Sequence, residues 1–195
     1  MIIACIGDSL TEGDYGVRGK RGIANIHKEN YPYFLAELTG AEVRNFGKCG
    51  YRSSTVLQYY KDGGIDVHGA DLVLVMLGTN GGQSPNEDTE DNRAYDELIT
   101  NLRADANGPV ILMTPLHATV DPAYSNCGYA PQVADAVAFV RKYAKERVLP
   151  LLDIAACTDF CAENEALYQA NDGLHCVAAG YQKLAQIIAN ALNLS

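Results

Sequence analysis

The chain has 195 residues, of which 48% are hydrophobic and 20% charged, as in a globular protein of one domain over residues 1–195. Its net charge of −9 disfavours nucleic-acid partners, because contacts to phosphates require a basic face. No apolar run approaches the ~20 residues of a membrane span, and no signal peptide precedes Gly7. We therefore expect a cytoplasmic protein without a membrane anchor, and its oligomeric state stays open.

Short apolar runs alternate with longer amphipathic segments along the chain. Strands are expected at 2–6, 42–46, 71–77, 110–113 and 150–154, and helices at 31–38, 53–61, 91–104, 131–148, 162–169 and 177–192. The run 71–77 is unbroken, which is typical of a central parallel strand buried on both faces. Strands that alternate with helices predict an α/β sandwich, with a parallel sheet covered on both faces.

The longest irregular stretches of the chain are 13–30, 78–90 and 114–130, and each follows a predicted strand. They therefore emerge at the carboxyl edge of the sheet, where open α/β folds bind ligands. The stretch 13–30 is rich in glycine and charge, and we interpret it as a mobile loop and a candidate lid.

Four polar segments flank the predicted strands or the last helix: 7–10, 45–50, 78–80 and 172–175. Serine is a poor nucleophile unless a base removes its proton, and His175 is the candidate base for Ser9. The base needs an acceptor for its other N–H, and Asp172 lies within one turn of it. Asp153 and Asp159 are alternative acceptors.

An attacked carbonyl becomes an oxyanion, which needs fixed hydrogen-bond donors. The candidates are the backbone N–H of Ser9, the backbone N–H of Gly50 and the side-chain amide of Asn80. Gly50 lacks a Cβ and therefore permits close approach, and Gly47 is its nearest competitor. Asn80 could also be a simple turn residue before two glycines.

The residues that carry a family resemblance are Gly7-Asp8-Ser9-Leu10, Gly50, Asn80 and Asp172-x-x-His175, flanked by Tyr31-Pro32, Asn45 and Gly180-Tyr181. In this order they resemble the GDSL/SGNH hydrolase superfamily, across nearly the whole chain. The resemblance implies a flavodoxin-like three-layer α/β/α sandwich with a central parallel five-stranded sheet.

The resemblance also assigns roles to single residues. Ser9 is the expected nucleophile, His175 the base and Asp172 its orienting acid, and Ser9, Gly50 and Asn80 form the expected oxyanion hole. No metal or organic cofactor is implied. Asp8 is expected to order the turn around Ser9 by hydrogen bonds to backbone amides.

Two positions depart from the family pattern. Gly81 stands where members often have aspartate, and we expect it to let the Asn80 loop move. Cys176 stands where many have proline. Neither change removes a catalytic group.

Other polar residues have simpler interpretations. The six cysteines are expected to be reduced, although Cys157 and Cys161 would share a helix face and are an alternative metal site. His117 is expected at the surface, with a place in the substrate pocket as the alternative.

The predicted activity is hydrolysis of an ester by a serine esterase through an acyl-enzyme. Tyrosines gather in the loops: Tyr15, Tyr31, Tyr33, Tyr51, Tyr124 and Tyr129. Polar aromatic loops favour a short acyl group, such as acetyl, on a carbohydrate or another small polar molecule. A lysophospholipase or an acyl-thioesterase is the alternative, and a catalytically silent flavodoxin-like binding module is a minor one.

Overall fold

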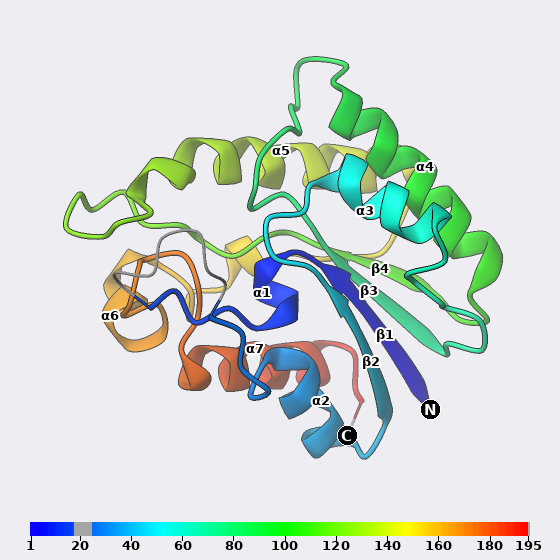
Figure 1. Cartoon of the computed structure of the whole chain (residues 1–195), viewed down its shortest axis with the longest axis horizontal. Helices are drawn as coiled ribbons and strands as arrows, with labels where there is room; N and C mark the ends of the chain where they lie inside the picture. Colours follow the sequence, from blue (N-terminus) through cyan, green and yellow to red (C-terminus); the bar gives the residue numbers. More distant parts are fainter. Residues whose placement is uncertain (18–24, 195) are drawn as a thin grey trace.

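A computed structural model describes residues 1–17 and 25–194, and in these residues five strands form one parallel sheet (Figure 1). The strands are β1 (Ile2–Gly7), β2 (Glu42–Gly47), β3 (Leu72–Met76), β4 (Val110–Met113) and β5 (Leu151–Leu152). Their order is β2-β1-β3-β4-β5. Because the chain turns to opposite sides after β1 and after β3, the carboxyl ends of these two strands form the switch point at which open α/β sheets bind ligands.

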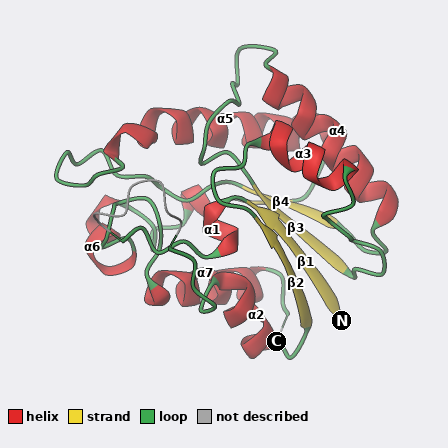
Figure 2. Cartoon of the chain, viewed as in Figure 1, coloured by secondary structure: helices red, strands yellow, loops and turns green. Residues whose placement is uncertain are grey.

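Helices cover both faces of the sheet. They are α1 (Ser9–Glu12), α2 (Tyr31–Thr39), α3 (Ser53–Lys61), α4 (Glu90–Asp105), α5 (Ala130–Arg147), α6 (Glu165–Tyr168) and α7 (Ala178–Ala191). Short 3₁₀ helices lie at Cys127–Tyr129, Ile154–Ala156 and Ala162–Asn164. Helices α3, α4 and α5 lie on one face, and α2 and α7 lie on the other (Figure 2). This arrangement confirms the predicted three-layer sandwich.

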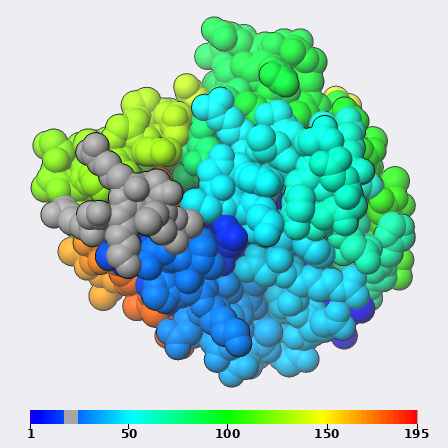
Figure 3. All heavy atoms as spheres, viewed as in Figure 1, coloured from blue at the N-terminus to red at the C-terminus, as the bar shows by residue number. Residues whose placement is uncertain are grey.

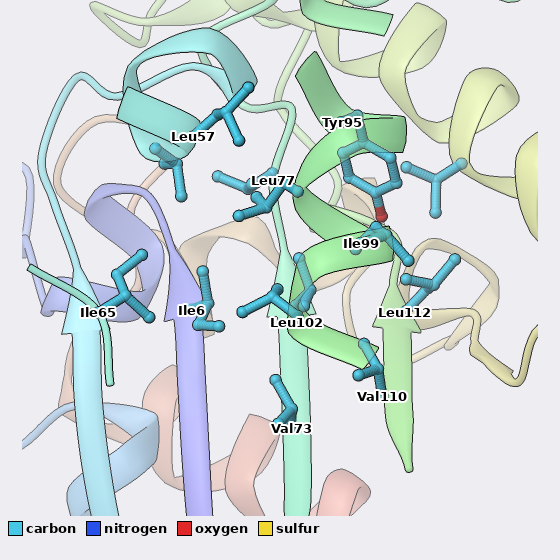
Figure 4. Close-up of a cluster of buried hydrophobic side chains, with 14 of the residues drawn as sticks. Ile6, Leu57, Ile65, Val73, Leu77, Tyr95, Ile99, Leu102, Val110 and Leu112 are labelled. Carbon is cyan, nitrogen blue, oxygen red and sulfur yellow. The ribbon is translucent and has the colours of Figure 1, made fainter. Parts of the chain in front are cut away.

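The strands alternate their side chains between two hydrophobic clusters. Ile6, Val73 and Leu112 point toward α3 and α4 (Figure 4), whereas Ile3 and Leu74 face α2 and α7. All of these side chains are buried. Burial on both faces explains why the central strands read as unbroken apolar runs in the sequence.

Two elements differ from the predicted ones. Strand β5 is only Leu151–Leu152, because the chain turns into a 3₁₀ helix after Asp153. Helix α1 was not predicted, since four residues are too few to show a helical period. Asp8 caps α1 by accepting a hydrogen bond from the Leu10 N–H, and Gly13 ends it with a left-handed φ of 108°.

The base of the stretch 13–30 is paired. Asp14 and Ile26 form an antiparallel bridge, and the Tyr15 N–H donates to the Asn25 carbonyl at 3.1 Å. The His27 N–H donates to the Gly13 carbonyl at 2.9 Å. Residues 18–24 lie outside the described part of the chain, so the lid interpretation stays a prediction.

The segment that contains Cys157 and Cys161 is not one helix, and both cysteines are free thiols. Cys157 follows one 3₁₀ helix and Cys161 precedes another, so the expected shared helix face is absent there. Within the described residues, no three His, Cys, Asp or Glu side chains are grouped as a metal site would require. Nor does any helix among them combine the length and apolar character needed to cross a membrane.

Candidate active site

Ser9 lies at the junction of β1 and α1. Gly7 ends the strand, and a Cβ there would lie 2.0 Å from Thr11 Oγ1 and 2.6 Å from the Met76 carbonyl oxygen. Only glycine therefore permits this tight turn. Ser9 is 2% exposed. In the space-filling view, the start of the chain reaches the surface in a small dark-blue area between the lighter blue and cyan of later segments (Figure 3).

The structure brings Ser9, His175 and Asp172 into one hydrogen-bonded line. Ser9 Oγ lies 2.8 Å from His175 Nε2, and His175 Nδ1 lies 2.7 Å from Asp172 Oδ2. Asp172 Oδ1 accepts the backbone N–H groups of Leu174 at 3.0 Å and His175 at 2.8 Å. This geometry fits His175 Nε2 as the acceptor of the serine proton and Nδ1–H as a donor to Asp172.

The two alternative acids are bound elsewhere. Asp153 accepts hydrogen bonds from the Arg141 guanidinium and from Thr114 Oγ1. Asp159 forms an ion pair with Lys183 at 3.1 Å. Asp172 is therefore the carboxylate that contacts the histidine.

The electrostatic surroundings favour the charged form of His175. Burial of the ring acts to lower its pKa, but the hydrogen bond and negative charge of Asp172 outweigh this, with help from Asp14 and Asp8. The net effect raises the pKa of His175 above its ordinary value of 6.5. An imidazolium formed by taking a proton from Ser9 is thus stabilised.

Asp8 connects the serine turn to the loop after β3. Its Oδ1 accepts the Leu10 N–H at 3.1 Å and its Oδ2 accepts the Thr79 N–H at 3.3 Å, which confirms the expected backbone contacts. Complete burial raises the pKa of Asp8 despite these hydrogen bonds. The side chain orders two backbone segments and does not face a reacting atom.

The Asn80 loop is held from several sides. Asn80 Nδ2 donates to the Tyr51 carbonyl at 2.9 Å, and Arg52 Nε donates to the Asn80 carbonyl at 3.0 Å. Gln132 Nε2 donates to the Thr79 carbonyl at 2.8 Å. Gly81 has a φ of +73°, a conformation that disfavours aspartate. The glycine therefore suits the conformation of this loop, and the expected movement of the loop stays a prediction.

Gly47 and Gly50 differ in their surroundings. The Gly47 N–H already donates to Asn45 Oδ1 at 2.8 Å, and a Cβ on Gly47 would lie 2.2 Å from Glu12 N. Gly47 thus packs β2 against α1. At Gly50 a Cβ would meet no described atom within 4 Å, and its φ of +76° is what favours glycine.

Glu12 was not singled out in the sequence. Glu12 Oε2 accepts the Cys49 N–H at 2.5 Å, and Asn45 Nδ2 donates to the Thr11 carbonyl at 2.8 Å. The two contacts tie β2 and the Gly50 loop to α1. No pattern in the sequence around Glu12 indicates this contact with Cys49.

The segment that carries Asp172 and His175 is held by side-chain amides that the sequence did not reveal. Asn126 Nδ2 donates to Asp172 Oδ2 at 2.7 Å. Gln169 is 1% exposed, and its Nε2 donates to the carbonyls of His117 at 2.7 Å and Leu174 at 3.0 Å. These partners are brought together only by folding, so no local pattern could have indicated them.

His117 has neither of the two expected environments. Its Nε2 lies 2.7 Å from Glu165 Oε1, and Thr119 Oγ1 donates to Glu165 Oε2 at 2.7 Å. Glu165 is buried, so these two partners satisfy a carboxylate that would otherwise be costly. His117 is therefore a bound, partly buried side chain that supports the neighbouring loop.

A hollow of about 560 Å³ lies beside the Asp172 segment. Its described lining consists of Val17, Asp121, Ala123, Tyr124, Ala170 and Asn171. Polar and apolar side chains are equally represented, and Asn171 directly precedes Asp172 in the chain. A small polar group suits such a lining better than a long hydrocarbon chain does.

The hydroxyl of Ser9 is hydrogen-bonded to a largely buried histidine–aspartate pair, and it lies at the switch point of a parallel sheet. Serine hydrolases use this arrangement. The family model for GDSL-like lipases and acylhydrolases matches residues 5–183. The chain belongs to this family and is a serine hydrolase of carboxylic esters. No curated protein sequence matches it.

Solved structures of esterases share the fold. The native aryl esterase of M. smegmatis superposes with a TM-score of 0.74 at 20% identity, covering 98% of both chains. A lipase/acylhydrolase from Enterococcus faecalis gives 0.71 at 18%, covering 98% of this chain and 94% of its own. A carbohydrate acetylesterase from Sinorhizobium meliloti gives 0.70 at 19%, covering 98% of both.

Proposed function

We propose that the protein is a serine esterase that removes short acyl groups, acetyl foremost, from a carbohydrate or another small polar molecule. The carrying observation is the line from Ser9 Oγ through His175 to Asp172, with contacts of 2.8 and 2.7 Å. Such a line activates a hydroxyl that is otherwise a weak nucleophile.

The reaction has two halves. Ser9 Oγ attacks the ester carbonyl while His175 Nε2 takes its proton, and the imidazolium then protonates the departing alcohol. The acyl group remains on Ser9. A water molecule then gives its proton to His175 and attacks the acyl-enzyme, which releases the acid and restores the serine. Asp172 stays ionised and holds Nδ1–H throughout.

Three donors are proposed for the oxyanion: the backbone N–H groups of Ser9 and Gly50, and Asn80 Nδ2. Asn80 Nδ2 carries two hydrogens, of which one goes to the Tyr51 carbonyl. The second is available for substrate. The hydrogen bonds that hold the Asn80 loop support this assignment, because preorganised donors make an oxyanion hole effective.

The substrate class is proposed from the lining of the hollow and from the relatives. Asp121, Tyr124 and Asn171 make the lining of the hollow partly polar, whereas a long acyl chain requires an apolar trench. The acetylesterase from Sinorhizobium meliloti is a carbohydrate esterase with this fold. The alternatives remain a lysophospholipase, an acyl-thioesterase and a catalytically silent binding module.

The test compares wild type with Ser9→Ala on p-nitrophenyl acetate, butyrate and octanoate and on a peracetylated monosaccharide. We expect activity that falls with chain length, release of acetate from the sugar, and loss of both in Ser9→Ala. Ser125→Ala, at an exposed serine, is the matched control and should behave as wild type. A rate that rises toward octanoate would favour the lipid or thioester alternatives. No serine-dependent turnover would favour a binding module.

A further inference from the structure

We infer that Asn126 is a positioning residue for catalysis, which acts by donating its side-chain amide to the same oxygen of Asp172 that His175 contacts. Asn126 Nδ2 and His175 Nδ1 both lie 2.7 Å from Asp172 Oδ2. Asn126 comes from the irregular stretch before α5, 46 residues from Asp172. This inference rests on the proposed function, because it assigns a partner to its acid.

The carboxylate of Asp172 is fully engaged. Its Oδ1 accepts two backbone N–H groups, from Leu174 and His175, and its Oδ2 accepts His175 Nδ1 and Asn126 Nδ2. Asp172 is 3% exposed, so water cannot easily replace a missing donor. A buried acceptor that loses a donor is left unsatisfied, and the folded state then carries the free-energy cost of its desolvation.

Asn126 comes from a distant part of the chain, unlike the other three donors to Asp172. Leu174 and His175 belong to the same turn as Asp172, so their hydrogen bonds move with the carboxylate. Asn126 is attached to the body of the protein through the 3₁₀ helix Cys127–Tyr129 and α5. A second contact, from the Asn126 N–H to the Asp172 carbonyl at 3.3 Å, reinforces the link. Asn126 thus places the acid relative to the sheet that carries Ser9.

The contact also has an electrostatic consequence. A donor on Oδ2 withdraws negative charge from the oxygen that faces the histidine. Three carboxylates act on His175, namely Asp172, Asp14 and Asp8, and together they raise its pKa. Removing the Asn126 donor strengthens the pull of Asp172 on the imidazolium. The pKa of His175 should therefore rise further.

The experiment measures kcat, KM and the pH profile of kcat/KM for Asn126→Ala and Asn126→Leu on p-nitrophenyl acetate. His175 acts as a base only when neutral, so activity rises with pH through its pKa. For Asn126→Ala we expect kcat to fall by about tenfold with little change in KM. The acid limb of its kcat/KM profile, where activity falls as His175 is protonated, should move to higher pH by roughly half a unit.

Asn126→Leu keeps roughly the size of the side chain and removes the donor to Asp172 without adding a charge. Its acid limb should move upward as that of Asn126→Ala does, because both variants remove the same hydrogen bond. This variant also gives the result if Asn126→Ala does not fold.

Two controls separate positioning from a purely structural role. Ser125→Ala alters the exposed neighbour and should leave kcat and the pH limb unchanged. Thr119→Val removes a hydrogen bond to Glu165 in the same stretch without removing a donor from Asp172. It should lower the melting temperature and leave the acid limb in place.

The inference is overturned if both Asn126 variants keep the wild-type acid limb, or if they only lose stability as Thr119→Val does. Ser9→Ala is measured alongside. If Ser9→Ala retains full activity, the proposed function fails and the inference with it. If Ser9→Ala is inactive and the Asn126 variants have a normal profile, the positioning role alone is wrong.

Discussion

The two halves of the site are built in different ways. The half that carries Ser9 and the proposed oxyanion donors lies at the ends of β1, β2 and β3, where close backbone packing leaves no space at Gly7 and Gly47. The half that carries Asp172 and His175 lies in a turn between α6 and α7. That turn is held largely by side-chain amides, from Asn126 and Gln169.

This difference separates what is rigid from what can be adjusted. A backbone contact at van der Waals distance tolerates little change, because the interior is close-packed. A side-chain hydrogen bond can be replaced by another polar residue at a smaller cost in stability. Changes at the tightly packed glycines of the serine half should therefore lower the stability of the fold, whereas changes in the amides that hold the histidine half should alter the rate and its pH profile.

His175→Ala is expected to lower the rate about as strongly as Ser9→Ala. The variant removes the base but leaves a partly buried position whose main partners are Ser9 and Asp172. We expect kcat to fall by roughly 10⁴-fold or more, with a melting temperature close to that of wild type. Steady-state kinetics and thermal unfolding check the prediction. A loss of less than tenfold would contradict the role of His175 as base.

Asn80→Ala should have the next largest effect and acts on the serine half. Removing one oxyanion donor lowers kcat by roughly 10²–10³-fold. Asn190→Ala, at an exposed position of α7, is the matched control and should retain wild-type kcat. Unchanged turnover in Asn80→Ala would mean that the amide serves only the Tyr51 carbonyl.

Gly47→Ala tests the rigidity of the serine half through stability. Its Cβ would lie 2.2 Å from Glu12 N and 2.6 Å from the Thr11 carbonyl carbon, so backbone must shift. We expect the free energy of unfolding to fall by about 1–3 kcal/mol. Gly128→Ala is the control, since no described atom lies within 4 Å of its Cβ. Urea denaturation of the two variants should differ clearly. Equal midpoints would show that β2 and α1 can separate without cost.

Much of the scaffold could be predicted from the chain. The apolar runs located all five strands, and the caps and glycines located the long helices, because local propensity and burial agree in these elements. The prediction was less accurate at β5 and missed α1. Both elements are too short for periodicity, and their ends depend on contacts with distant residues.

The residues of the candidate site divide in the same manner. Ser9, Asp172 and His175 could be proposed from their types and spacing, since the base needs an acceptor for its second N–H and Asp172 lies within one turn of it. The choice of Asp172 over Asp153 came from the structure, where Arg141 binds the competitor. Likewise, the amide of Gly47 proved to be engaged by Asn45.

The sequence by itself determined the alternation of strands and helices, and it placed the candidate nucleophile, base and oxyanion donors at segments that a parallel sheet brings together. Only the tertiary structure decided which amides surround Asp172, how the Asn80 loop is bound and why Glu12 contacts Cys49. The physical reason is range. Periodicity and caps act over a few residues, whereas these hydrogen bonds join residues 29 to 46 positions apart and form only after the sheet and its helices have packed.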